Sequence, residues 1–380
     1  MTAAGLIFSN IHDSSIPELT RRRTMASVPF GCRYRLIDFA LSNMVNSDIT
    51  KIGIITHYNY QSLLDHIGTG KDWDLARRSG GIKILPPFIT AYENAASGRV
   101  YSSRLEALMG VMNFISRCNE DYIVLSDCDV VCNIDLKDVI RFHEKNGADI
   151  TVVTKKLDAK AHELNAHVMV VDADDDGRIR DFVEYTGSED EQGEIDISTN
   201  IMVMKRTYLQ NEVLNSMAHG YTSFYRDIIG KNKKKSKFMA YRYEGFYELI
   251  SSMESYFKCS MQMLQPRVRE TLFCERNRPI LTKVRNSAPT KYASDAKVTN
   301  SLVADGCVIE GEVENSIIFR GVHIGRGTVV KNCVLLQDTY VGEKAELDCV
   351  VTDKNVLIKD ERHLSGHESM PFFIGKGISV

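Results

Sequence analysis

The chain contains 380 residues, a length that normally forms about two domains, because a single hydrophobic core stops growing near ~250–300 residues. A formal net charge of −3, with 43% hydrophobic and 26% charged residues, is typical of a globular protein and gives no reason to expect nucleic-acid or membrane partners. Nine cysteines without a C-x-x-C pair, no apolar run of about 18 residues and no signal peptide predict a cytoplasmic protein with free thiols.

Over roughly the first 250 residues, short apolar segments alternate with helical patterns, which predicts an α/β fold with a mainly parallel sheet. The predicted strands are residues 6–8, 51–56, 122–126, 149–154, 167–171 and 201–204. The predicted helices are residues 34–46, 60–66, 104–117 and 254–264. Residues 172–178 are rich in Asp and Gly, which tolerate left-handed backbone, and are expected to form a hairpin turn.

The C-terminal residues follow a different period. Aliphatic residues recur six apart at Leu302 and Val308, then at Ile318, Ile324, Val330 and Leu336, then at Val341 and Leu347. This period, with small or polar residues between, predicts a left-handed parallel β-helix of stacked hexapeptide coils. Shifts of register around Val313 and after Leu336 predict loops or imperfect coils. Ordinary antiparallel strands are the alternative, which the constant six-residue phase disfavours.

The segment between these two patterns is punctuated by Pro266, Pro279 and Pro289, which favours a linker. The predicted organisation is therefore an α/β domain at 1–265, a linker at 266–290 and a β-helix at 291–380. We expect the β-helix to mediate assembly, because its flat faces and strand edges suit coverage by another subunit.

Residues 28–46 read VPFGCRYRLIDFALSNMVN, in which Leu36, Phe39 and Leu41 also have the spacing of core residues. The segment resembles V-P-F-G-G-x-x-R-x-I-D-F-x-L-S-N-x-x-N of the bacterial ADP-glucose pyrophosphorylases (glucose-1-phosphate adenylyltransferases). The resemblance spans nearly the whole chain. It implies a Rossmann-like (GT-A-like) nucleotidyltransferase domain followed by a β-helix. The reaction it implies is ATP plus glucose 1-phosphate ⇌ ADP-glucose plus pyrophosphate.

The segment that precedes this motif aligns with the nucleotide-binding loop of the family but lacks the residues that bind the phosphates. Where the family has three loop glycines, an arginine and a lysine, this chain has Asn10, Ile11 and Asp13, then Ser15, then Met25. Glycine lets backbone N–H groups approach phosphate oxygens, and the cations stabilise charge on the transferred phosphoryl group. Ile11 adds a branched side chain and Asp13 a negative charge where phosphates belong. A tight surface turn that never bound a ligand is the alternative.

The resemblance implies that active relatives hold Mg²⁺ with two aspartates, since the ion bridges the phosphates of both substrates. The first corresponds to Asp129 in Ser126-Asp127-Cys128-Asp129 and is retained. The second corresponds to Leu249, which cannot bind a metal. Asp127 or Glu248 could substitute only with a different backbone direction. We therefore predict no metal or other cofactor for this chain, with Mg²⁺ used by a catalytic partner.

Positions implied to contact adenine and sugar are altered as well. In the family's G-T-A-D-A motif, Arg104 adds bulk beside the adenine. In F-x-E-K-P, Glu184 is retained and Tyr185 replaces the sugar-phosphate lysine, while in M-G-I-Y the glycine becomes Asn200. Positions in the loop, the metal site and the pockets are thus altered, while the residues that form the fold are retained. This pattern favours a protein whose function depends on its fold and surfaces and not on catalysis.

Five arginines follow the altered loop: Arg21, Arg22, Arg23, Arg33 and Arg35. Guanidinium groups at this density suit bidentate recognition of phosphate. In the family, basic residues matching Arg22, Arg23 and Arg35 line the site for phosphorylated metabolite effectors. A solvated basic patch or intersubunit salt bridges are the alternatives.

Together these features resemble the regulatory, non-catalytic subunits of the family. The resemblance implies assembly with a catalytic subunit into a heterotetramer that makes ADP-glucose for glycogen, or a homo-oligomer when alone. One alternative is an active sugar-phosphate nucleotidyltransferase that uses substitute residues. Another is a hexapeptide-repeat acyltransferase, for which His323 is the candidate base.

Overall fold

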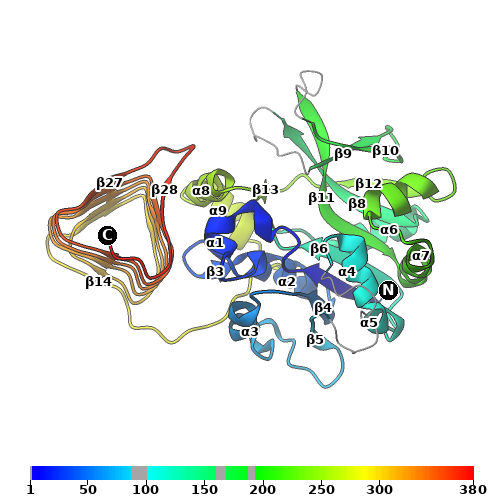
Figure 1. The fold of residues 1–380 in the computed structure, drawn as a ribbon, viewed down its shortest axis with the longest axis horizontal. Helices are drawn as coiled ribbons and strands as arrows, with labels where there is room; N and C mark the ends of the chain where they lie inside the picture. Colours follow the sequence, from blue (N-terminus) through cyan, green and yellow to red (C-terminus); the bar gives the residue numbers. More distant parts are fainter. Residues whose placement is uncertain (1, 88–100, 160–167, 187–192) are drawn as a thin grey trace.

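The computed structural model describes residues 2–87, 101–159, 168–186 and 193–380. Figure 1 shows an α/β domain joined through an extended segment to a prism of stacked strands, which is seen end-on as a triangle. None of the helices in these ranges combines the length and the apolar character that a membrane span requires.

The α/β domain is built on a nine-stranded mixed sheet (Figure 1). Its strands are β1 (Ala3–Phe8), β4 (Lys51–Ile55), β5 (Gly81–Leu85), β6 (Tyr122–Asp127), β8 (Ile150–Asp158), β9 (Met169–Ala173), β10 (Ile179–Glu184), β11 (Glu194–Lys205) and β12 (Phe238–Arg242). The order is β10-β9-β11-β6-β1-β4-β5, and β8 pairs with both β11 and β12. Strands β6, β1, β4 and β5 are parallel, whereas β11 is antiparallel to β6 and β8.

Each predicted strand overlaps one of these strands, although residue 167 lies outside the described residues. The predicted hairpin turn at 172–178 joins β9 to β10, which pair antiparallel. The predicted helix at 34–46 begins at Leu36, because residues 34 and 35 form the short strand β3 (Tyr34–Arg35), paired with β2 (Pro29–Phe30). The predicted helix at 104–117 is interrupted at Val111.

Helices cover both faces of the sheet. The helices that pack on one face are α2 (Leu36–Asn46), α3 (Gln61–Ile67) and α6 (Leu136–Lys145). Those on the other face are α4 (Arg104–Gly110), α5 (Met112–Ser116) and α7 (Arg206–His219). Strand β1 contributes Ile7 to the first core and Leu6 and Phe8 to the second, because successive side chains of a strand point to opposite faces.

The C-terminal domain is the predicted left-handed parallel β-helix, made of three five-stranded parallel sheets. The first sheet contains β14 (Lys291–Tyr292), β17 (Val308–Ile309), β20 (His323–Ile324), β23 (Tyr340–Val341) and β26 (Leu357–Ile358). The second contains β15 (Lys297–Thr299), β18 (Glu312–Glu314), β21 (Val329–Lys331), β24 (Glu346–Asp348) and β27 (His363–Ser365). The third contains β16 (Leu302–Val303), β19 (Ile317–Ile318), β22 (Val334–Leu335), β25 (Val350–Thr352) and β28 (Phe372–Ile374).

The predicted shifts of register correspond to coils shorter than three full hexapeptides. Glu312 pairs with Val329, and Val329 with Glu346, a spacing of 17 residues, whereas Lys297 and Glu312 are 15 apart. Asn315 and Asn332 adopt left-handed backbone, with φ of 46° and 49°, a conformation that asparagine tolerates. The shifts are therefore imperfect coils.

The two domains share a hydrophobic core. Phe30, Phe39 and Tyr256 of the α/β domain belong to the same buried cluster as Phe319 and Leu336 of the β-helix. Helices α8 (Met253–Gln262) and α9 (Pro266–Phe273) lie beside the β-helix in Figure 1. The segment expected to be a linker therefore begins with a helix, α9, which buries Val268 and Leu272 in this core.

Candidate functional site

The loop that follows β1 is stabilised by hydrogen bonds between its own residues. Asp13 begins a 3₁₀ turn (Asp13–Ser15), and its Oδ1 accepts a hydrogen bond of 2.6 Å from the backbone N–H of Met25. Burial raises the pKa of Asp13 to about 7, although the Met25 N–H opposes this shift. The Thr20 hydroxyl donates to the Asp13 carbonyl at 2.5 Å. Asp13 therefore fixes the loop backbone, a role that the sequence did not reveal.

The other altered loop positions are also packed or bonded within the domain. Asn10 is buried and its Oδ1 accepts a hydrogen bond of 3.2 Å from the Tyr101 hydroxyl. Ile11 packs against the core that contains Phe8, and Ser15 is half-buried. Met25, at the lysine position, is 1% exposed and belongs to the interdomain core. The loop is thus a packed structural element.

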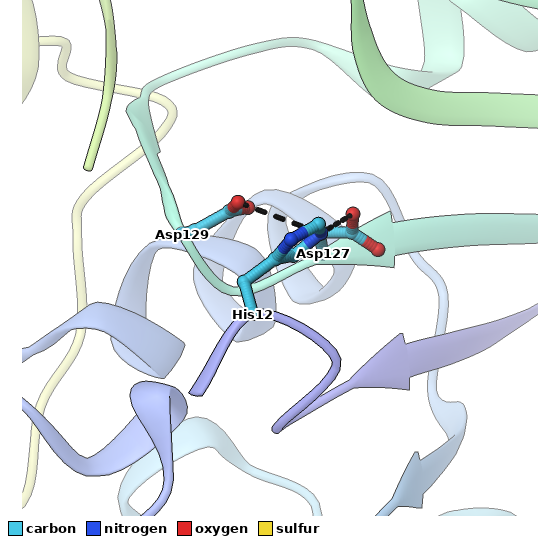
Figure 2. Close-up of side chains that lie close together, drawn as sticks. All are labelled: His12, Asp127 and Asp129. Atoms are coloured by element: carbon cyan, nitrogen blue, oxygen red, sulfur yellow. Dashed lines mark hydrogen bonds and ion pairs between the residues drawn. The ribbon is translucent and has the colours of Figure 1, made fainter. Parts of the chain in front are cut away.

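His12, which the sequence reasoning did not single out, lies between two buried carboxylates (Figure 2). Its Nε2 is 2.9 Å from Oδ2 of Asp127 and 3.6 Å from Oδ2 of Asp129. Asp127 ends β6, and Asp129 lies in the turn that leads to β7 (Val130–Cys132). Among the described residues, these three form the one group of potential metal ligands whose donor atoms lie within 4.8 Å of one another.

Arg104 provides a second cation for the same carboxylates. It is the first residue of α4, it is 9% exposed, and its Nη2 donates a hydrogen bond to Asp127 Oδ2. Its guanidinium carbon lies 5.5 Å from the ring centre of Phe8 and 5.9 Å from that of Tyr225, at distances typical of cation–π contacts. Arg104 therefore adds charge to this cluster of side chains as well as the predicted bulk.

The pKa values of the cluster reflect opposing effects of burial and charge. Burial lowers the pKa of His12, but Asp129 and Asp127 outweigh it and raise this pKa to about 9. Burial raises the pKa of Asp127, but Arg104 and His12 hold it below its usual value. Burial raises the pKa of Asp129 to about 6, against the attraction of His12. The favoured state at neutral pH pairs two cations with two carboxylates.

Leu249 lies near Asp129 in the structure. It ends β13 (Tyr247–Leu249) and pairs with Val130 of β7, and the following N–H, of Ile250, donates to the Asp129 carbonyl at 2.7 Å. Glu248, the other substitute considered, accepts a hydrogen bond of 2.9 Å from Gln262. Mg²⁺ requires several oxygen ligands, and this cleft offers an alkyl side chain and two cations beside its carboxylates. The residues present do not fit Mg²⁺.

The altered positions that the resemblance assigns to the sugar and nucleotide pockets lie in two places. Asn200 lies near Arg104, whereas Glu184 and Tyr185 lie at the end of β10. Asn200 adopts left-handed backbone with φ 59°, and its Oδ1 accepts a hydrogen bond of 2.8 Å from the hydroxyl of Tyr225, the ring that also contacts Arg104. Glu184 is at the exposed end of β10, and the N–H of Tyr185 donates to Val168 at 2.8 Å. Glu184 and Tyr225 both line a cavity of about 490 Å³.

The five candidate effector arginines are also separated. Arg33 and Arg35 line a pocket at the junction with the β-helix. Arg23 is 3% exposed, and its Nη2 donates to both carboxylate oxygens of Asp353, at 2.7 and 2.9 Å. Arg21 and Arg22 are exposed and are not among the residues that line this pocket.

Four further basic residues line the interdomain pocket, and sequence reasoning missed them because they come from distant segments. They are Lys283, Arg285, Arg320 and Lys354. Burial, and next the nearby Arg35 and Arg23, lower the pKa of Lys354 to about 7. Arg35 is itself anchored by a hydrogen bond of 2.9 Å from its Nη1 to the Ser62 hydroxyl. The pocket is small, with a volume of about 30 Å³, and its described lining is strongly basic.

Comparison with known families agrees with both domains. The nucleotidyl transferase family matches residues 16–245, and the GlmU-like C-terminal hexapeptide family matches residues 287–369. The fold and these matches define the class of protein, a nucleotidyl transferase domain joined to a hexapeptide β-helix.

Individual relatives cover most of the chain. The glycogen biosynthesis protein GlgD of Bacillus subtilis (strain 168) is 35% identical over 376 residues, 98% of this chain and 96% of that protein. The glucose-1-phosphate adenylyltransferase of Fervidobacterium nodosum is 30% identical over 362 residues, 94% of this chain and 84% of that protein. That of Geobacillus stearothermophilus is 31% identical over 320 residues, 84% of this chain and 80% of that protein. The chain belongs to the nucleotidyl transferase family, among the glucose-1-phosphate adenylyltransferases and GlgD proteins.

Proposed function

We propose that this chain is a regulatory subunit of glucose-1-phosphate adenylyltransferase in glycogen biosynthesis. It is deficient in catalysis itself and modulates a catalytic subunit within a heterotetramer. The observation that carries this proposal is the cleft in which His12 and Arg104 pair with the carboxylates and Leu249 replaces one of them, on an otherwise intact fold.

The altered cleft supports catalytic deficiency on energetic grounds. Phosphoryl transfer depends on positioned cations that stabilise charge in the transition state, and removal of one such group typically costs ~3–4 kcal/mol, or ~10²–10³ in rate. Here Ser15 and Met25 replace loop cations, and Leu249 replaces a metal ligand. Substitute residues would have to replace all three, and His12 and Arg104 are already engaged with Asp127.

The interdomain pocket supports a regulatory role. Arg33 and Arg35 come from the α/β domain and Arg320 and Lys354 from the β-helix, so an anion bound between them contacts both domains. Guanidinium and ammonium groups suit a phosphorylated metabolite. A ligand that prefers one relative placement of the two domains shifts the equilibrium toward it.

The outer face of the β-helix supports assembly. His323, Tyr340 and Leu357 occupy equivalent outward positions in successive coils, and Tyr340 and Leu357 are 45% and 41% exposed. The ring of His323 stacks on that of Tyr340, with centres 4.6 Å apart. An aligned apolar row on a sheet suits a subunit contact.

Reconstitution with a purified catalytic subunit tests the proposal. The isolated chain should make essentially no ADP-glucose, and mixing should give a complex of tetramer mass whose effector response differs from that of the catalytic subunit alone. Light scattering and pyrophosphate release measure the two properties. Turnover by the isolated chain at ordinary enzymatic rates, with a host enzyme excluded, would instead support an active transferase.

Substitution of the apolar row is a sharper test of assembly than removal of the β-helix, because removal also opens the core shared by both domains. Tyr340→Arg with Leu357→Arg should weaken the complex while the fold is retained. The matched control is Lys297→Glu, an exposed change on a different face. An unchanged complex mass would place the contact elsewhere.

A further inference from the structure

Two of the positions altered relative to the family motifs, Arg104 and Asn200, are connected to each other through one network of side chains. Asp127 Oδ2 accepts hydrogen bonds from His12 and from Arg104, and Arg104 lies over the ring of Tyr225. The Tyr225 hydroxyl in turn donates to Asn200 at 2.8 Å and lies 2.9 Å from the Ser198 hydroxyl. These residues come from five separate segments and form one network.

The carboxylates at its centre require a counter-charge. Asp127 and Asp129 are 2% and 3% exposed, and Oδ1 of each lacks a hydrogen-bond partner among the described residues. Two buried carboxylates two residues apart repel each other, and burial without compensation carries a large desolvation cost. His12 and Arg104 are the cations that reach them.

Arg104 is held in place for this role. The Ser103 hydroxyl caps α4 by accepting from the N–H of Glu106 at 3.2 Å, which fixes the start of the helix that carries Arg104. The aromatic rings of Phe8 and Tyr225 contact its guanidinium.

We propose that His12 and Arg104 replace the divalent cation of the family as the built-in counter-charge of Asp127 and Asp129. The cluster of His12, Asp127 and Asp129 then binds no divalent cation, and Arg104 stabilises the fold in place of the ion. A metal ion would have to displace Arg104 from Asp127 and lie beside two positive charges. This inference concerns the cleft alone and does not depend on regulation or assembly.

Mn²⁺ is a suitable probe, because it accepts both imidazole and carboxylate ligands and is detected directly by electron paramagnetic resonance. The full chain should bind no Mn²⁺ at millimolar concentration, and neither Mn²⁺ nor EDTA should change its melting temperature. Arg104→Met should lower the melting temperature by about 5–10 °C, since it leaves Asp127 with an incomplete counter-charge. Mn²⁺ should recover part of that loss and bind once per chain.

Two further variants define the outcome. Arg141→Met is the matched control, because Arg141 is exposed and pairs only at the surface with Asp138, so its melting temperature should not change. The double variant Arg104→Met with Asp127→Asn should have a higher melting temperature than Arg104→Met alone and should not bind Mn²⁺. It also provides the test if the single variant does not fold. Stoichiometric Mn²⁺ binding by the unaltered chain, abolished by His12→Ala, would overturn the proposal and make the cluster a metal site. Equal melting of Arg104→Met and Arg141→Met would also overturn it.

Discussion

Two clusters of basic side chains, one in the cleft and one between the domains, differ in how their charge is balanced. In the cleft, His12 and Arg104 face Asp127 and Asp129 at hydrogen-bond or ion-pair distance. In the interdomain pocket, the described lining residues include six Arg or Lys side chains and no Asp or Glu. Arg320 has Asp305 nearby at 3.0 Å, but that carboxylate is not part of the lining.

The difference predicts how each cluster responds to an added ion. A cluster whose charges are satisfied internally gains little from an added ion, whereas like charges gathered in one pocket repel each other until an anion arrives. Burial is the largest cause of the lowered pKa of Lys354, and the nearby Arg35 and Arg23 lower it further. The charges of the first cluster are therefore balanced by its own side chains, whereas the described lining of the interdomain pocket is basic throughout its charged positions.

The largest expected effect concerns the closed cleft. Leu249→Asp restores the missing carboxylate, yet the variant should remain at least ~10⁴-fold below a catalytic subunit, because the loop cations are still missing and such groups act as a unit. Pyrophosphate release measures the rate, with the catalytic subunit as the positive control. Turnover comparable with that control would show that the internal charges do not close the cleft.

The second-largest expected effect is a loss of stability when Arg23 is removed, which distinguishes this buried arginine from the exposed Arg21. Arg23→Ala should reduce the free energy of unfolding by about 3–5 kcal/mol, because Asp353 is left buried without its partner. Arg23→Met with Asp353→Leu should recover most of the loss. The control is Arg21→Ala, which alters an exposed arginine and should be nearly neutral. Denaturant unfolding followed by circular dichroism measures all three, and equal stability of Arg23→Ala and Arg21→Ala would refute a structural role for the ion pair.

A smaller effect is expected in the open pocket. If the pocket receives an anionic effector, Arg33→Ala should raise the half-saturating effector concentration of the reconstituted complex roughly tenfold, in the range of typical allosteric couplings. Arg22→Ala, an exposed arginine outside the pocket, should leave the titration unchanged. A raised half-saturating concentration in Arg22→Ala with no change in Arg33→Ala would instead place the effector site at the solvent-exposed arginines.

The smallest effect is a pH dependence of anion binding. Lys354 titrates near pH 7 in the empty pocket, because burial and the neighbouring Arg35 and Arg23 disfavour its charged form. An anion favours the charged form, so sulfate affinity should fall as pH rises above 7, by at most about tenfold per pH unit, and level off below 7. Lys354→Met should flatten this profile in calorimetric titrations. An unchanged slope in that variant would assign the dependence to another group.

The same shift has the opposite consequence for stability. The unfolded chain keeps the Lys354 proton to near pH 10.5, whereas the folded chain releases it near pH 7. Because the unfolded state binds more protons across this window, the contribution of Lys354 to stability rises with pH from about 7 to 10.5.

The fold could be predicted from local patterns. Strands β1, β4 and β6 are short apolar runs bounded by turns, and the six-residue period of the C-terminal part defines the β-helix. The predicted core positions Leu36, Phe39 and Leu41 are each 0% exposed. These features depend on residues that are close together in the sequence, so they can be recognised without knowledge of the tertiary structure.

The partners of the site residues could not be predicted in this way. The order of β1 and β6 in the sheet brings His12 to Asp127, which is 115 residues away, and α4 adds Arg104. One signal was available, since β1 and β6 are parallel and the loops that follow parallel strands meet at one edge of a sheet. Tyr225 had no comparable signal, because it comes from a short π-helix (Phe224–Gly230) and not from a loop that follows one of these parallel strands.

The sequence by itself determined the two-domain architecture and the family resemblance. Only the tertiary structure decided which charges are paired. Arg23 and Arg35 are twelve residues apart, yet one is paired with Asp353, 330 residues away, and the other lines a pocket completed by Lys283 and Lys354. The reason is physical, because the energy of a charge depends on its burial and on neighbours that the fold supplies from distant parts of the chain.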